Sequence, residues 1–531
     1  MNQKKLQVWL PLLLSVAVFI GMFFGYKLKD NMGQYAPSFF SKQKRTPLQE
    51  ILELVQSKYV DTVNTDSLGY LAVQNVLSQL DPHSVYIPTE QVLAVNEDLQ
   101  GSFEGVGIEF ELMNDTVTVL KLFSKGPAEI AGIQVGDKLI KANDTLISGS
   151  KMAESKIKKQ FRGSKGTTVK VMLLRNKQKM ELVIKRGVIP VKSVDVAYMI
   201  EPGIAFVRLN KFAGNTYEEF MKNLERLKGE GMKKLILDLR DNGGGMLDDA
   251  IQIADEFLND SKEIVYTEGK SSPRQNYAAR RPGMFEEGTL ILLIDEGSAS
   301  ASEVLAGALQ DWDRATIVGR RSFGKGLVQD QFLLSDGSAL RLTVSRYYTP
   351  IGRSIQKPYT RGNSNKYEEE ISNRYANGNL FQNDSANHKG KAYKTKSGRT
   401  VFGGGGISPD VFVAADSTEI YLHKNYTYFK EALLKTAFTY FILSKEKLLP
   451  LKTPQALLKS IKEENTLWQL FETNISKTNF SAVVFTPLQK QFIETQLQAM
   501  IARLLWNTEG YFKIYNLSDF VVQKAVTIAK Q

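Results

Sequence analysis

The stretch from Leu290 to Gln329 places a serine-rich turn between a strand and a helix, and no other feature constrains the fold as much. Leu290–Ile294 is a short apolar run typical of a buried strand. The small-residue segment GSASASE follows at 297–303, and apolar residues then recur at helical spacing through Trp312. A serine at a helix start lies beside backbone N–H groups that lack intrahelical acceptors and favour negative charge. Acyl transfer needs such a nucleophile and such donors.

A lysine between two glycines follows this turn, and the segment around it permits other interpretations. GRRSFGK at 319–325 matches seven positions of a phosphate-binding P-loop, but the eighth is Gly326, so the hydroxyl that would hold Mg²⁺ is missing. Ser322 and Lys325 also fit the S-x-x-K pattern, although the neighbouring glycines disfavour the helix that this pattern needs. A third interpretation is that the small residues only allow a helix to pack closely on a sheet.

Several motifs in a fixed order resemble those of the C-terminal processing (tail-specific) peptidases, family S41. They are DLRDNGGG at 238–245, GSASASE at 297–303, SFGKG at 322–326, VQ at 328–329, RYYTP at 346–350 and GRSIQ at 352–356. The similarity extends over about residues 45–415. Because several motifs recur together, the resemblance is far more specific than a single short pattern.

The resemblance implies catalytic roles for particular residues. It makes Ser300 the nucleophile, Lys325 the general base and Gln329 the residue that orients the lysine. It assigns the oxyanion hole to the backbone N–H of Ala301 with that of Gly244 or Gly245. No metal and no organic cofactor is implied.

The chemistry of the side chains is compatible with a lysine as the base. The chain has three histidines, His83, His388 and His423, and none lies in the core motifs. A lysine can accept the serine proton if burial lowers its pKa and keeps it neutral. A glutamine amide can hold the amine without adding a charge that would raise that pKa. His83, in the helix-breaking segment DPHS at 81–84, is interpreted as structural.

The N-terminus predicts a membrane anchor. Leu6–Tyr26 is an apolar run of about 20 residues, long enough to span a bilayer, and it lacks the A-x-A-like exit of a cleaved signal peptide. Lys4 and Lys5 favour a cytoplasmic N-terminus. We therefore expect a single-pass protein of the cytoplasmic membrane with its catalytic part in the periplasm. Residues 1–29 form the anchor and its flanks, and residues 30–44 a polar tether.

The remaining chain divides into four parts. Residues 45–97 form a helical segment, 98–188 a β-rich domain, 189–415 the core with a polar insertion at about 357–400, and 416–531 a mostly helical extension. In the core, strands alternate with helices, which indicates a mixed α/β sheet. The predicted fold class is thus a multidomain α+β protein with an N-terminal transmembrane helix and a core of the S41/ClpP-crotonase type.

The β-rich domain resembles a PDZ domain. Val106, Gly107, Ile108 and Phe110 are assigned to the turn and strand that would bind a peptide's terminal carboxylate. Arg162 is expected to couple this domain to the core.

Together these features predict a serine endopeptidase that recognises the free C-termini of protein substrates. The alternative is an inactive PDZ-bearing scaffold or sensor that only binds peptides. The helical segments are possible sites for a homo-oligomer or an adaptor. A net charge of +11, spread over scattered lysines, argues against a nucleic-acid partner, and the absence of cysteine excludes disulfides and thiol chemistry.

Overall fold

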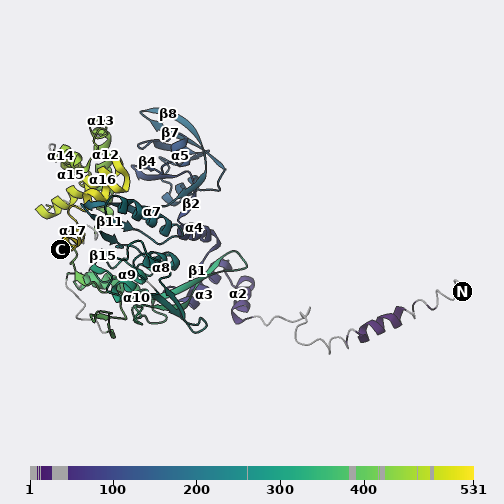
Figure 1. Cartoon of the computed structure of the whole chain (residues 1–531). Coiled ribbons are helices and arrows are strands. Elements are labelled where there is room, and N and C mark those ends of the chain that lie inside the picture. The colour runs from purple at the N-terminus through teal and green to yellow at the C-terminus, as the bar shows by residue number, and fades with distance from the viewer. Residues whose placement is uncertain are drawn as a thin grey trace. The chain divides into compact units, whose positions relative to one another are not determined.

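The computed structural model describes residues 9, 11, 14–24, 26, 46–259, 261–378, 380–381, 390–416, 418, 425–462, 465–478 and 484–531. The chain divides into two compact units, residues 1–73 and 74–531 (Figure 1). Unit 1 contains α2 (Pro47–Lys58), which Thr46 begins with a capping box to Gln49. Helix α3 (Thr65–Ser78) spans the boundary between the units. These two helices lie in the segment at 45–97 for which the sequence predicts a helical pattern.

The predicted transmembrane helix is wrong. In the part of the chain that the structure describes, no helix combines the length and the apolar character that a bilayer crossing requires. The tether at 30–44 lies outside the described residues.

A β-domain follows helix α4 (Thr89–Gln100) in unit 2. Its main sheet has the order β3-β4-β5-β7-β8, with β6 paired to β5. The strands are β3 (Ile108–Met113), β4 (Thr116–Leu122), β5 (Lys138–Ala142), β6 (Thr145–Leu146), β7 (Thr168–Arg175) and β8 (Gln178–Lys185), with helices α5 (Pro127–Ile130) and α6 (Glu154–Phe161). Strand β2 (Ser102–Gly105) pairs with β9 (Gly187–Pro190) at the base of the domain. β3 is an edge strand, so its outer edge can accept another strand.

The core is a six-stranded sheet with the order β10-β11-β12-β15-β16-β21. The strands are β10 (Val194–Glu201), β11 (Ile204–Leu209), β12 (Lys234–Asp238), β15 (Thr289–Ile294), β16 (Thr316–Gly319) and β21 (Val411–Phe412), and all neighbours except β10 and β11 are parallel. The connecting helices are α7 (Thr216–Gly229), α8 (Leu247–Asp255) and α9 (Ala301–Asp311). These ranges confirm the alternation of strands and helices that the sequence predicts.

Alternate side chains of each strand point to opposite sides of this sheet. Both faces are buried, because helices cover both of them. On one face Val207, Leu237 and Leu292 pack against helices α7, α8 and α9. On the other face Phe206, Ile236 and Ile291 pack against α17 (Phe520–Lys530), the last helix of the chain. The near-continuous apolar strands follow from this double coverage.

A second sheet has the order β1-β18-β13-β14, with β17 also paired to β18. Its strands are β1 (Val85–Ile87), β13 (Glu263–Glu268), β14 (Gln275–Ala278), β17 (Leu327–Leu333) and β18 (Ala339–Tyr348). β18 pairs with β1, β13 and β17. β18 therefore joins β1, near the start of unit 2, and β17, which follows Lys325, in one sheet.

The polar insertion at about 357–400, whose polar composition favours an exposed loop, contains a helix. Residues Ser364–Ala376 form helix α10, which Asn363 caps by accepting a hydrogen bond from the Lys366 N–H at 3.2 Å. The pattern hid this helix because its buried side chains include the polar Tyr367 and Arg374. Strands β19 (Ala392–Lys394) and β20 (Thr400–Phe402) form a short hairpin, and residues 382–389 lie outside the described part.

The C-terminal extension is helical, as predicted. Its helices are α12 (Tyr426–Leu443), α13 (Lys445–Leu448), α14 (Pro454–Lys462), α15 (Thr466–Ile475), α16 (Pro487–Tyr515) and α17. α12 to α16 share a hydrophobic core of their own, and Arg503 on α16 forms an ion pair with Glu109 of the β-domain at 2.7 Å. The extension therefore contacts both the core sheet and the β-domain.

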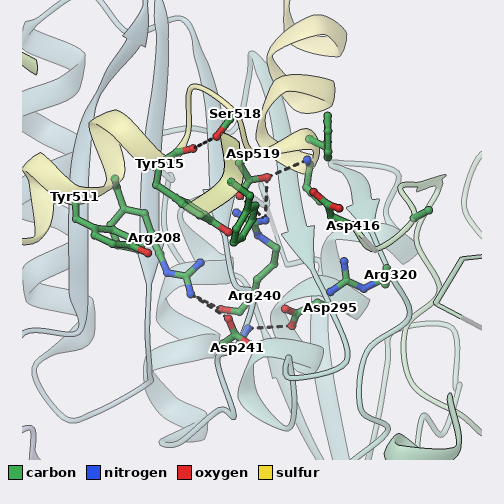
Figure 2. Close-up of a pocket in the computed structure, with 15 residues that line it drawn as sticks. Arg208, Arg240, Asp241, Asp295, Arg320, Asp416, Tyr511, Tyr515, Ser518 and Asp519 are labelled. Carbon is green, nitrogen blue, oxygen red and sulfur yellow. Dashed lines mark hydrogen bonds and ion pairs between the residues drawn. The ribbon is translucent and has the colours of Figure 1, made fainter. Parts of the chain in front are cut away.

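An ion-pair network fixes α17 to the carboxyl end of the sheet. Figure 2 shows Arg240 between the strand ends and Asp519, which caps α17 and accepts from Arg240 at 2.9 Å. Burial opposes the ionisation of Asp238, but the Arg240 and Arg208 guanidinium groups lower its pKa to about 2. A pocket of about 210 Å³ lies between these strand ends and helices α16 and α17.

We expect Val522→Asp to destabilise the folded chain by ~3 kcal/mol or more, because it places an unpaired charge against the sheet. Val522 is 0% exposed and belongs to the cluster that α17 forms with the sheet. Urea denaturation measured by circular dichroism tests this. Lys524→Asp, on the exposed side of the same helix, is the matched control. Equal stability of the two variants would show that α17 is dispensable for the core.

Candidate active site

Ser300 lies in a strained turn between β15 and α9. Its backbone has φ 55° and ψ −115°, a conformation that is uncommon for a residue other than glycine. Two hydrogen bonds hold the turn: the Ala299 N–H donates to the Asn242 carbonyl at 3.0 Å, and the Ser300 N–H donates to Glu303 at 2.9 Å. The Ser300 side chain is half-buried at the first turn of α9. The turn thus presents a hydroxyl next to a helix N-terminus.

The glycine turn after β12 lies directly against Ser300. A Cβ at Gly244 would lie 2.7 Å from the Ser300 Cβ and 2.9 Å from the Ala301 N, so only glycine fits there. The Gly244 N–H donates to the Asn242 Oδ1 at 3.0 Å, whereas the Gly245 N–H has no acceptor in the described part of the chain. Ala301 is the first residue of α9, so its N–H lacks an intrahelical acceptor.

The Lys325 loop is held by hydrogen bonds from several sides. The Phe323 N–H donates to the Ser298 carbonyl at 3.0 Å, and the Lys325 N–H donates to the Glu303 carboxylate at 2.8 Å. Gln356 accepts from the Gly326 N–H at 2.8 Å. The loop is therefore attached to the serine turn and to the segment after β18.

The Lys325 side chain is half-buried, and its environment disfavours the charged amine. Burial lowers the pKa of Lys325, and the Arg341 guanidinium lowers it further. The Glu303 and Asp81 carboxylates act in the opposite direction. The net shift is downward, which increases the fraction of neutral amine.

Two buried residues that the sequence analysis did not assign contact both parts of the site. Glu303 accepts hydrogen bonds from the backbone N–H of Ser300 and of Lys325. The Tyr347 hydroxyl contacts the carbonyl oxygens of the same two residues. The available signal for Glu303 was its position three residues after Ser300, which is the spacing of a capping box.

Gln329 lies on β17 at an irregularity in its pairing with β18. Its Nε2 is buried and has no hydrogen-bond partner among the described residues. A buried amide donor without a partner is costly, so this group is available to a base or to a ligand. Its predicted role in orienting Lys325 stays a prediction.

The two rival interpretations of the lysine segment do not fit the structure. The Ser322 hydroxyl is fully buried, donates to Glu303 and accepts from the Ile407 N–H at 2.6 Å, so it is not free to act as a nucleophile. Residues 320–326 connect strand β16 to strand β17, whereas a P-loop leads into a helix. The close-packing interpretation accounts for Gly244 but not for a strained serine.

His83 lies beside the site, and its Nε2 shares a hydrogen bond of 2.9 Å with the Tyr367 hydroxyl. Burial, together with the positive charges of Lys325 and Lys357, lowers the pKa of His83 to about 4. His83 is therefore neutral at pH 7 and adds no charge near Lys325. His388 and His423 lie outside the described residues.

Comparisons with known proteins identify the family and the two domains. The model of peptidase family S41 matches residues 203–363, and that of the PDZ domain matches residues 105–185. A carboxy-terminal-processing protease of Bartonella bacilliformis is 38% identical over 314 residues, which cover 58% of this chain and 71% of the relative. The chain belongs to peptidase family S41. It is a serine-type peptidase with a PDZ domain.

Other similarities are more distant or cover less of the relative. A probable CtpA-like serine protease of Staphylococcus aureus is 34% identical over 310 residues, and the match spans 58% of this peptidase and 62% of the relative. The solved structure of a photosystem II D1 C-terminal processing protease is 27% identical and covers 68% of this peptidase and 86% of its own chain, with a TM-score of 0.35.

The four residues predicted for the PDZ peptide site lie on one turn and strand of the peptidase. Val106 is buried, and its carbonyl accepts from the Ala128 N–H at 2.8 Å. Gly107 has φ 76°, and Ile108 begins the edge strand β3. The Phe110 ring lies 6.0 Å from Phe161 on α6. A groove between an edge strand and a helix is the usual place for a PDZ ligand.

Arg162 follows α6 and contacts α4 rather than the core sheet. It forms an ion pair with Glu97 and lies 4.4 Å from the centre of the Phe103 ring. Asp98, which like Glu97 lies on α4, accepts from the Lys211 Nζ of the core at 3.0 Å. A connection from the PDZ domain to the core therefore runs through α4.

We expect Gly244→Ala to reduce peptidase activity by about 10²-fold, because the new Cβ would displace Ser300 and misplacing a reacting group by about 1 Å has a cost of that order. Gly243→Ala is the matched control, since a Cβ there meets nothing within 4 Å. The rate of cleavage of an unfolded protein substrate is the measurement. Equal loss in both variants would mean that the turn as a whole, and not the close approach to Ser300, is responsible.

Proposed function

We propose that this S41 peptidase cleaves peptide bonds through a Ser300–Lys325 dyad and an acyl-enzyme intermediate. The observation that carries the proposal is that one buried carboxylate, Glu303, binds the backbone N–H of both residues. The serine is thereby placed at the start of α9, and the backbone that carries the amine is attached to the same turn.

The reaction begins with the neutral amine of Lys325 removing the proton from the Ser300 hydroxyl while the Oγ attacks the scissile carbonyl carbon. The ammonium formed on Lys325 then protonates the leaving amine as the C–N bond breaks. In the second half Lys325 activates a water molecule, which hydrolyses the ester and releases Ser300. The lowered pKa of Lys325 makes the neutral base more abundant near neutral pH.

The negative oxygen of the tetrahedral intermediate needs backbone donors. We assign the N–H of Ala301 and that of Gly245. Of the two predicted glycines, Gly245 is preferred because its N–H has no acceptor among the described residues, whereas Gly244 donates to Asn242. The role of Gly244 is then steric, since its missing side chain lets the turn approach Ser300.

Removing either member of the dyad should abolish turnover. We expect Lys325→Ala to lower kcat by about 10²–10⁴-fold, the usual contribution of an acid–base group, and Ser300→Ala to lose acyl-enzyme formation. Lys222→Ala, at an exposed position on α7, is the control for loss of a lysine. Degradation of casein is the readout. Equal activity in all variants would exclude the dyad, and no activity in the wild type would favour the peptide-binding scaffold.

We further propose that the PDZ domain binds the free C-terminus of a protein substrate. The peptide would add as a strand to the open edge of β3, and the backbone N–H groups of the turn at Val106, Gly107 and Ile108 would bind its carboxylate. Phe110, which is partly buried and packs against Phe161, would contact apolar side chains of the peptide. An extracytoplasmic location, an adaptor and a homo-oligomer stay predictions.

A peptide with an amidated C-terminus should bind the inactive Ser300→Ala protein about tenfold or more weakly than the same peptide with a free carboxylate. A hydrogen bond to a charged group contributes ~1.5–3 kcal/mol, and ~1.4 kcal/mol corresponds to a factor of ten. Isothermal titration calorimetry gives both dissociation constants. Identical affinities would exclude recognition of the terminal carboxylate.

A further inference from the structure

We propose that Glu303 and Tyr347 are positioning residues that clamp the backbones of Ser300 and Lys325 together for proton transfer. The inference rests on the proposed dyad and adds two residues to it. Neither side chain touches the reacting atoms, so both act through the two residues that they hold.

Glu303 supplies one side of the clamp. It is 0% exposed, and its two oxygens accept four hydrogen bonds. Oε2 accepts from the N–H of Ser300 at 2.9 Å and of Lys325 at 2.8 Å, while Oε1 accepts from the Gly324 N–H at 2.7 Å and from the Ser322 hydroxyl. Four donors offset only part of the cost of removing a carboxylate from water, because burial still raises the pKa of Glu303 to about 7.

Tyr347 supplies the opposite side of the clamp from strand β18. It is 2% exposed, and its hydroxyl lies 3.1 Å from the Ser300 carbonyl oxygen and also contacts the Lys325 carbonyl oxygen. Its own N–H donates to the Gly326 carbonyl at 3.2 Å. The amides of the dyad residues are thus held by one buried side chain, and their carbonyls by another.

A clamp of this kind matters because the two residues come from different segments of the chain. Ser300 precedes α9, whereas Lys325 lies in the loop between β16 and β17. Proton transfer requires their side chains to approach within ~2.6–3.2 Å, so small independent shifts of the two segments would be costly. Shared hydrogen bonds make the segments move as one body.

Glu303 also affects the base electrostatically. The charged groups that face Lys325 are Arg341 on β18, Glu303 on α9 and Asp81 before β1, and neutral His83 lies close by. The Glu303 carboxylate raises the pKa of Lys325, in opposition to burial and Arg341. Replacing Glu303 by glutamine therefore lowers the pKa of the amine and moves the acid limb of the activity profile to lower pH.

The test compares Glu303→Gln and Tyr347→Phe with two matched controls. Glu256→Gln removes another buried carboxylate, which accepts from the Tyr217 hydroxyl at 2.6 Å, and Tyr198→Phe removes another buried hydroxyl, which accepts from Asn516 at 3.1 Å. For each protein we would measure kcat and KM across the acid limb, labelling of Ser300 by a fluorophosphonate, and the circular dichroism spectrum.

We expect kcat to fall by about 10²-fold in both clamp variants, with KM within a few-fold of the wild type, as for a misplaced reacting group. The acid limb should move to lower pH in Glu303→Gln and stay in place in Tyr347→Phe, and the controls should resemble the wild type. A merely structural role would not move the limb. Should Glu303→Gln fail to fold, the loss of kcat in folded Tyr347→Phe decides for the clamp.

Three results would contradict the inference in different ways. If Ser300→Ala abolishes labelling and cleavage while both clamp variants keep the wild-type kcat, the clamp is wrong and the dyad stands. If Ser300→Ala cleaves as fast as the wild type, the dyad is wrong and the clamp falls with it. An unchanged acid limb in a folded Glu303→Gln variant would refute the electrostatic part.

Discussion

The backbone conformation of Ser300 is the constraint on which the site depends. A non-glycine residue with positive φ is held at a cost of about 1–3 kcal/mol and persists only where its surroundings determine it. Here the surroundings are Asn242, which binds the preceding amide, and Glu303, which binds the serine amide. The strain is therefore maintained by hydrogen bonds from the glycine turn after β12 and from the first turn of α9.

The second sheet extends this arrangement to Lys325, the proposed base. Strand β18 pairs with β17, which begins two residues after Lys325, and it also carries Tyr347 and Arg341. Helix α10 covers the same loop, because Arg374 donates to the carbonyls of Arg321 and Ser322 at 3.1 and 2.9 Å. A loop with this many backbone partners has little freedom, which suits the role of general base proposed for Lys325.

The C-terminal extension is a structural part of the peptidase core. Helix α17 covers one face of the core sheet, and the Arg240–Asp519 ion pair attaches it to the same chain segment that leads into the glycine turn at Gly244. The extension also contacts the β-domain. Arg503 pairs with Glu109 on β3, and Lys435 donates to Asn114, in the turn after β3, at 3.2 Å. The strand proposed to receive a substrate tail and the segment that leads into the glycine turn at Gly244 are thus both in contact with the C-terminal extension.

Much of the core could be predicted from the sequence because its signals are local. Apolar strands such as Leu290–Ile294, the glycines after Asp238 and the helical pattern after Ser302 each depend on neighbouring residues, and the structure has elements at all three places. The same local reasoning wrongly assigned a transmembrane helix to the N-terminal apolar run. It also missed α10, whose buried face is built from polar and aromatic side chains with no apolar period.

By itself, the sequence determined where the strands, turns and candidate nucleophile lie along the chain, because hydrophobic period and glycine placement are properties of short segments. Only the tertiary structure decided that Tyr347 contacts the carbonyls of Ser300 and Lys325, which lie far from it in the sequence. It also decided that Asp81 and His83 lie beside Lys325. Such contacts depend on strand pairing between distant segments, on the register of β18 against β17 and β1, and on which face a side chain takes in that register.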